Sequence, residues 1–204
     1  VHLSGGVSSF ELTLFANYVD NFLAIAERDF LGGQVATQQK RTNGASEFIN
    51  IAEEVNQGLS LITFFGHSSA TVTDIDIGFV SNDEFGYRNK GKYPAILLNG
   101  CNAGNVFSTT LTFGEDWIRT ADRGALHVMA HSSIGISSTL KQYSDRFYEV
   151  AFGDSAWIDQ SLGAAKVEAE RRFIERLGES AWEMHISQVQ QLVLQGDPSI
   201  PLFG

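Results

Sequence analysis

The sequence predicts an α/β protein, a three-layer α/β/α sandwich in which a mostly parallel sheet lies between two layers of helices. Short apolar runs alternate along the chain with longer amphipathic stretches, which is the pattern of repeated βαβ units. Three runs, at 59–65, 95–98 and 125–130, are apolar enough to be central strands covered on both faces. With 204 residues, 43% of them hydrophobic, the chain can bury one core of ordinary size.

The remaining elements are placed by the breaks between these runs. Two further strands are expected at 1–3 and 34–37, and helices at 9–28, 46–56, 113–122, 139–152, 161–177 and 181–195. The polar segment 83–92 contains two glycines and is expected to be a loop with at most a short helical turn. No repeat or linker divides the chain, so one domain is expected to span 1–204. Because the chain opens on the apolar segment VHLSGG, we expect it to be a fragment of a longer protein.

Charge and cysteine content exclude several classes of function. The formal net charge of −10 argues against binding to nucleic acid or to an anionic membrane surface. No apolar run reaches the length of a membrane span. The single cysteine rules out an intrachain disulfide and every zinc site that needs several thiolates.

Two expected strands are each followed directly by a side chain that can take part in catalysis. The run LSLITFF leads directly into GHSS, which contains His67, and the run AILL leads into NGCNAG, which contains Cys101. In open α/β sheets the functional residues lie beyond the carboxyl ends of the strands, where the loops converge. We therefore expect the imidazole and the thiol to lie at the same edge of the sheet.

An imidazole beside a thiol is the arrangement used in nucleophilic catalysis. The thiolate is the attacking species, and a neighbouring histidine accepts the thiol proton and later protonates the leaving group. Residue types alone leave the alternative open that Cys101 is a core thiol and His67 a structural loop histidine, because spacing in sequence does not prove contact.

Longer motifs around both residues resemble the gingipain family of cysteine peptidases, relatives of the caspases. The similar segments, in the family's order, are HLSGG, FINIAEEVNQGLSLITFFGHSS, LLNGCNAGNVF, TFGEDWIRTADRGALHVMAHSS and LVLQGDPSIPLF. The resemblance implies the caspase and gingipain type of fold, a catalytic subdomain whose upstream partner subdomain lies outside this chain, and cleavage of protein or peptide substrates. It further implies a bacterial protein that is secreted or held at the cell surface.

Position by position, the resemblance assigns Cys101 as nucleophile and His67 as its proton-transfer partner. The backbone N–H groups of Cys101 and Ser68 are expected to hold the oxyanion. Two positions depart from the family. Ser68 replaces the usual glycine after the histidine, and Ser4 replaces the carboxylate that orients the imidazole, so either the dyad works unaided or Glu11 or another acid substitutes.

Substrate contacts are assigned by the same resemblance to Glu11, His131 and Ser132. Glu11 matches an acidic residue that binds a basic substrate side chain, and its alternative role is that of a solvated glutamate at a helix N-terminus. The segment that contains His131 and Ser132 matches the wall of the family's substrate cleft. His131 either contacts the substrate or caps its strand.

No cofactor or metal is needed for this chemistry, although Asp74 and Asp76 in TVTDIDIG could contribute to a structural calcium site. Their alternative role is to order the loop after His67 through local hydrogen bonds. Two other functions remain open beside peptide hydrolysis. One is a non-catalytic binding or assembly module, which the serines at positions 4 and 68 favour. The other is a sortase-like transpeptidase of the type IX secretion system.

Overall fold

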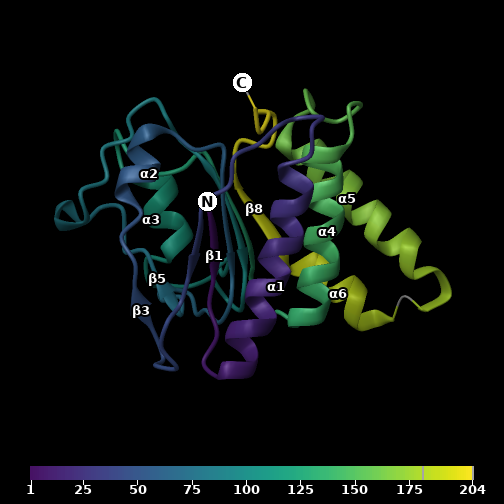
Figure 1. Ribbon diagram of the computed structural model, residues 1–204, viewed down its shortest axis with the longest axis horizontal. Helices are drawn as coiled ribbons and strands as arrows, with labels where there is room; N and C mark the ends of the chain where they lie inside the picture. Colours follow the sequence, from purple (N-terminus) through teal and green to yellow (C-terminus); the bar gives the residue numbers. More distant parts are fainter. Residues whose placement is uncertain (181, 204) are drawn as a thin grey trace.

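A computed structural model describes residues 1–180 and 182–203, and its centre is a twisted β-sheet (Figure 1). Strands of this sheet follow the order β2 (Thr37–Gln39), β1 (His2–Ser4), β4 (Leu61–Phe65), β6 (Ala95–Asn99), β7 (His127–His131) and β8 (Leu192–Gly196). Neighbouring strands from β2 to β7 are parallel, and β8 is antiparallel to β7. A separate short ribbon pairs β3 (Glu47–Phe48) with β5 (Ile75–Asp76).

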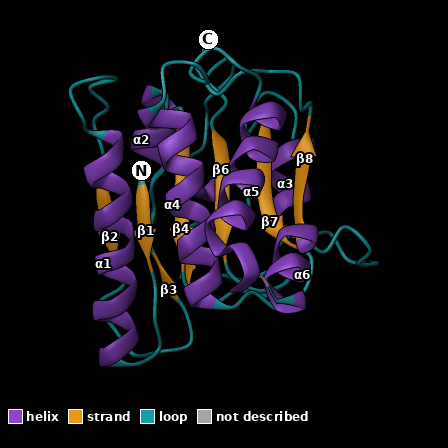
Figure 2. Ribbon diagram, turned by 90° about the vertical axis from the view of Figure 1, so that its right-hand side faces the viewer, coloured by secondary structure: helices purple, strands orange, loops and turns teal. Residues whose placement is uncertain are grey.

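Helices cover both faces of the sheet, so the three-layer prediction is confirmed. One face carries α1 (Ser9–Ala26) and α4 (Ser137–Gly153), with α5 (Leu162–Leu177) and α6 (Glu183–Gln191) packed beside α4 (Figures 1 and 2). The other face carries α2 (Ala52–Gln57) and α3 (Phe113–Arg119). Short 3₁₀ turns occupy Asp83–Phe85 and Gly178–Ser180. No helix in residues 1–180 and 182–203 is long and apolar enough to cross a membrane.

Two apolar cores, one on each face, hold the layers together. The inward side chains of β4, β6 and β7 alternate between them, so that Leu97 and Met129 pack under α1 and α4 while Ile96 and Val128 pack under α2 and α3. These strands are buried at every position, as expected for parallel strands covered on both faces.

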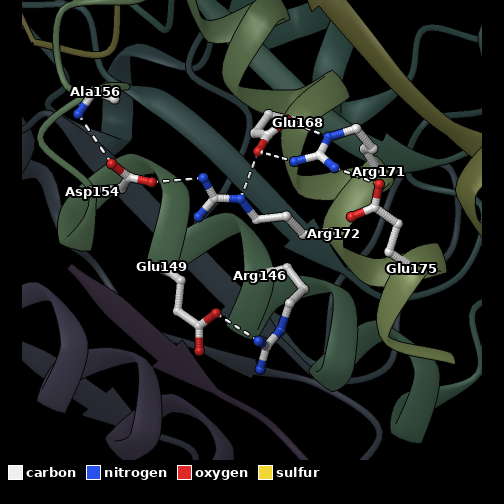
Figure 3. Close-up of polar contacts among 8 residues, drawn as sticks. All are labelled: Arg146, Glu149, Asp154, Ala156, Glu168, Arg171, Arg172 and Glu175. Carbon is white, nitrogen blue, oxygen red and sulfur yellow. Dashed lines mark hydrogen bonds and ion pairs between the residues drawn. The ribbon is translucent and has the colours of Figure 1, made fainter.

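Charged side chains link α5 to the segment that follows α4 (Figure 3). Glu168 accepts hydrogen bonds from Arg171 and Arg172, and Arg172 also pairs with Asp154 in the segment after α4. Because Asp154 in turn accepts the Ala156 N–H, the network links α5 to the turn that precedes it.

Three sequence predictions about secondary structure are wrong. The strand expected at 34–37 begins only at Thr37 and runs to Gln39. The segment 181–195 was expected to be one helix, and its first residue lies outside the described part. The helix ends at Gln191, and Leu192–Gly196 forms β8 instead. Pairing with the open edge of β7 satisfies backbone groups there, and this tertiary pairing overrides the local helical pattern. Likewise, the helix expected at 46–56 begins only at Ala52, because Glu47–Phe48 pairs with β5.

The strand order creates a topological switch point between β1 and β4. From β1 the chain passes to β2 on one side, and β4 lies on the other side. The loops that leave the carboxyl ends of β1 and β4 therefore diverge. In open α/β sheets, ligands bind at such a point of divergence. His67 follows β4 at this point, and Cys101 follows β6 next to it.

Candidate active site

Adjacent strands leave the sheet through glycines at this edge. Gly5, Gly66 and Gly100 follow β1, β4 and β6, and the backbone ladder continues through them, since Gly5 N–H donates to Phe65 O and Gly66 N–H to Asn99 O. A side chain does not fit at Gly100, because a Cβ there would lie 2.2 Å from Ser68 Oγ. The glycines therefore allow the loops that carry His67 and Cys101 to approach each other closely.

Cys101 is partly exposed at the start of the loop after β6. Its Sγ accepts the Gly135 N–H at 3.3 Å and lies 3.7 Å from the Gly135 carbonyl oxygen. The loop is braced against the segment after β7, because Asn102 N–H donates to Ser133 O at 2.8 Å. The thiol is thus held at the surface of the sheet edge, not sealed inside the core.

His67 presents its imidazole to solvent beside the first turn of α1. Its side chain is 49% exposed, and Nε2 lies 3.1 Å from Glu11 Oε1. The backbone around it is fixed by a short antiparallel turn, in which Asp74 N–H donates to His67 O at 2.8 Å. The imidazole therefore has a carboxylate partner, although the position before the paired glycines is Ser4.

Ser68 connects the histidine loop to the cysteine loop. Its Oγ donates a hydrogen bond of 2.7 Å to the carbonyl oxygen of Cys101. Within residues 1–180 and 182–203, neither the Ser68 N–H nor the Cys101 N–H donates to a protein acceptor. These are the two groups that the sequence assigns to the oxyanion.

Glu11 has two structural roles at the N-terminus of α1. Its Oε2 accepts the Val7 N–H at 3.0 Å and a hydrogen bond from Ser8 Oγ, while Ser8 Oγ caps the Glu11 N–H. Its Oε1 faces His67. Partial burial by itself would raise the pKa of Glu11, but the hydrogen bonds from Val7, His67 and Ser8 hold that pKa below its ordinary value. The side chain is therefore an ionised partner of the imidazole.

His131 lies in the wall beside the cysteine loop, but its ring is buried. It is 2% exposed, and Nε2 lies 3.0 Å from the Gln188 carbonyl oxygen of α6. Burial lowers the pKa of His131 to about 4, which keeps the ring neutral. This placement favours its role at the end of the strand over substrate contact. Ser132 is partly exposed, and its N–H donates to Gln191 O.

Asp74 and Asp76, the two candidate calcium ligands, bind backbone N–H groups. Asp74 Oδ2 accepts the Gly6 N–H at 2.6 Å, and Asp76 Oδ1 accepts the Gly78 N–H at 2.8 Å. In the part of the chain that the structure describes, no group of three or more His, Cys, Asp or Glu side chains is placed to hold a metal. The contacts of both carboxylates fit the role of ordering the loop after His67.

A cavity of about 670 Å³ lies at the opposite edge of the sheet, before the amino ends of the strands. Its lining includes Val1 and Leu61 at the amino ends of β1 and β4, and Tyr148 and Phe152 of α4. Although a large pocket is the usual first hypothesis for a small-molecule site, His67 and Cys101 lie at the other edge of the sheet.

Comparison with known proteins identifies the family. The family profile described as peptidase family C25 matches residues 6–203. This chain belongs to peptidase family C25. The resemblance to gingipains inferred from the motifs is therefore confirmed. No curated protein sequence gives a significant match.

Solved structures of gingipains share the fold. Crystalline gingipain R (RgpB), an arginine-specific cysteine proteinase, superposes with a TM-score of 0.73 at 16% identity, covering 98% of this chain and 46% of the gingipain. The complex of the pro- and mature domains of RgpB from Porphyromonas gingivalis gives 0.74 at 16% identity, covering 98% and 47%. A structure described only as a protease gives 0.76 at 13% identity, covering 98% and 48%. The chain thus spans about half the length of these relatives.

Several residues around the site carried no clear signal in the sequence. Lys40 is buried at the end of β2, and its ammonium group contacts the loop after β1. Gln188 of α6 bonds the carbonyl of Ile134 and the N–H of Ile136, and so holds the loop whose Gly135 contacts the thiol. A glycine after a strand can be recognised as a close-approach position, whereas a lysine or glutamine far along the chain cannot.

Proposed function

We propose that this chain is a cysteine endopeptidase domain in which Cys101 is the nucleophile and His67 transfers protons. The observation that carries the proposal is the hydrogen bond from Ser68 Oγ to Cys101 O, because it puts the histidine loop directly against the cysteine loop. Membership of peptidase family C25 supports the reaction class.

In the proposed reaction, His67 accepts the Cys101 proton and the thiolate attacks the carbonyl carbon of the scissile peptide bond. The N–H groups of Cys101 and Ser68 stabilise the oxyanion that forms. The C–N bond then breaks as the imidazolium donates its proton to the leaving amine, which leaves a thioester. Water, deprotonated by His67, adds to the thioester, and the C–S bond breaks to release the acid product and the thiol. These steps ask for no metal or organic cofactor.

Glu11 takes the role of the orienting carboxylate that gingipains have at the position of Ser4. Its contact of 3.1 Å with His67 Nε2 orients the imidazole and favours the imidazolium that forms during the reaction. This contact weakens the case for a non-catalytic binding module, which rested on the serines at positions 4 and 68. Glu11 and Ser132 remain candidate substrate contacts, and we infer an exported or surface location from the resemblance to gingipains.

Cleavage of a casein-type protein substrate and of mixed peptides tests the proposal. Cys101→Ala is expected to lower the rate by at least about a thousandfold, as for other nucleophile replacements. The matched control is Thr109→Ala, an exposed position in the same loop, which should cleave like the unmodified chain. Undiminished cleavage by Cys101→Ala would end the proposal. An amine nucleophile added to the assay separates the two reaction outcomes, because a conjugated product in place of an acid product would indicate transpeptidation.

A further inference from the structure

We propose that Lys40 and Asp74 are positioning residues of this site, buried charged side chains that clamp Gly6 from both sides and thereby hold Glu11 beside His67. The inference rests on the proposed function and extends it to residues from two other loops. Lys40 follows β2 and Asp74 precedes β5, and both reach the loop between β1 and α1.

The clamp holds both backbone groups of Gly6. Asp74 Oδ2 accepts its N–H at 2.6 Å, and Lys40 Nζ donates to its carbonyl oxygen at 2.8 Å. Lys40 Nζ also donates to the carbonyl of Gly44, and its backbone N–H donates to Ser4 O at 3.0 Å. Gly6 has φ of +134°, a conformation that only glycine adopts without strain. The chain is thus fixed in one conformation at the point where it turns from β1 toward α1.

Gly6 lies directly against the first turn of α1. A Cβ at Gly6 would come within 2.7 Å of the Leu12 nitrogen and 3.1 Å of Glu11 Cβ. The next residue, Val7, donates its N–H to Glu11 Oε2. Any displacement of Gly6 would therefore move the backbone that holds the Glu11 carboxylate.

Asp74 also holds the other partner of this pair. Its backbone N–H donates to the carbonyl oxygen of His67 at 2.8 Å. Asp74 therefore contacts Gly6, next to Glu11, through its side chain and His67 through its backbone. One residue sets the separation between the carboxylate and the imidazole.

Stability alone does not account for these two charges. Lys40 is 1% exposed and Asp74 is 3% exposed, and burying charged groups away from water is costly unless each is well paired. Asp74 Oδ1 has no hydrogen-bond partner within residues 1–180 and 182–203. It packs against the glycines after β1 and β4, where a Cβ would lie 1.9 Å from it at Gly5 and 2.4 Å at Gly66. Burial raises the pKa of Asp74, and the N–H groups of Gly6 and His67 and the charge of Lys40 oppose that rise. Burying these two charges beside His67 and Cys101 costs stability, and the positioning of Glu11 explains why they lie there.

The test combines Lys40→Met and Asp74→Leu, which removes the acceptor for the Gly6 N–H, with Glu11→Gln in double-mutant cycles. Each single variant is expected to lower kcat for peptide cleavage by about two- to fivefold with KM unchanged within twofold, because the clamp acts through Glu11 and touches no substrate. In the Glu11→Gln background the same replacements should change kcat by less than twofold, since the group they position is already lost. Asp116→Leu is the matched control and should leave kcat unchanged, because Asp116 is also buried and accepts a backbone N–H, that of Ser81, but does not contact Gly6.

A second readout needs no activity. The imidazole ¹⁵N resonances of His67 report its hydrogen bond to Glu11. They should move in Lys40→Met and Asp74→Leu in the same direction as in Glu11→Gln, but not in Asp116→Leu. Far-ultraviolet circular dichroism establishes that each variant is folded, and the nearly isosteric Asp74→Leu carries the test if Lys40→Met does not fold. Equal kcat losses with and without Glu11, or unmoved resonances, would overturn the clamp. Resonances that move as expected in a chain that cleaves no peptide would instead refute the proposed function alone.

Discussion

Glu11→Gln separates the two roles that the structure gives this carboxylate. Glutamine keeps an oxygen for the Val7 N–H and removes the negative charge that faces His67. The loss of helix capping should be small, roughly 0.5 kcal/mol in the free energy of unfolding, because an acceptor remains. A hydrogen bond to a charged group contributes about 1.5–3 kcal/mol, but the His67 side chain is 49% exposed and the Glu11 side chain 25% exposed. Solvent screening therefore reduces the expected effect to about 1 kcal/mol.

That free energy corresponds to a decrease of roughly fivefold in kcat/KM, measured by initial rates of peptide cleavage. Glu115→Gln is the matched control, because Glu115 occupies the same position in the capping box of α3, with Thr112 N–H at 2.9 Å from its Oε2. Both variants should lose similar stability in urea titrations, and Glu115→Gln should retain full activity. Equal rates for the two variants would refute a role for Glu11 in orienting the imidazole.

Three further outcomes follow from individual contacts. Gly104→Ala would place a Cβ 2.2 Å from a backbone carbonyl oxygen of β7. Urea titration should show that the free energy of unfolding falls by about 1–3 kcal/mol, together with reduced cleavage. Unchanged stability would contradict this packing. Ser68→Ala removes the bond to the Cys101 carbonyl and should cost about 1 kcal/mol of stability, with a lower kcat as the sign that the two loops have separated. Arg171 holds the pKa of Glu168 at about 2, against 4.5 for the free side chain. The ionised Glu168 therefore stabilises the folded state fully above pH 4.5, and this stabilisation is lost as the pH falls toward 2. The thermal unfolding of Glu168→Gln should accordingly depend less on pH over that range than that of the unmodified chain.

Periodicity in the sequence predicted the centre of the fold because burial on both faces forces a continuous apolar composition. β4, β6 and β7 appear as such runs, and each lies within three residues of its expected position. The edge of the sheet was less predictable. Leu192–Gly196 becomes a strand through pairing with β7, and that pairing depends on a partner more than fifty residues away, which no local pattern records.

The shared location of His67 and Cys101 at one edge of the sheet was predictable from the sequence for a related reason. Parallel strands deliver the residues that follow them to one edge, so an apolar run ending in Gly-His and another ending in Gly-Cys imply neighbouring loops. The resemblance to gingipains then supplied the assignment of roles. It also located the departures at Ser4 and Ser68, and for Ser4 it left open whether Glu11 or another acid substitutes.

Composition and motif spacing thus predicted that the loops of His67 and Cys101 lie at one edge of the sheet, because these features depend on short stretches of chain and on the regular geometry of βαβ units. The sequence named Glu11 as one possible carboxylate for the imidazole, but coordinates were needed to select it and to add Lys40 and Asp74. Glu11 lies in the first turn of α1, and Lys40 and Asp74 lie in two loops. They are brought together around Gly6 only because β2, β1 and β4 lie side by side and glycines let their ends touch. Charged side chains that converge through packing leave no periodic trace along the chain, so their cooperation is a property of the folded molecule.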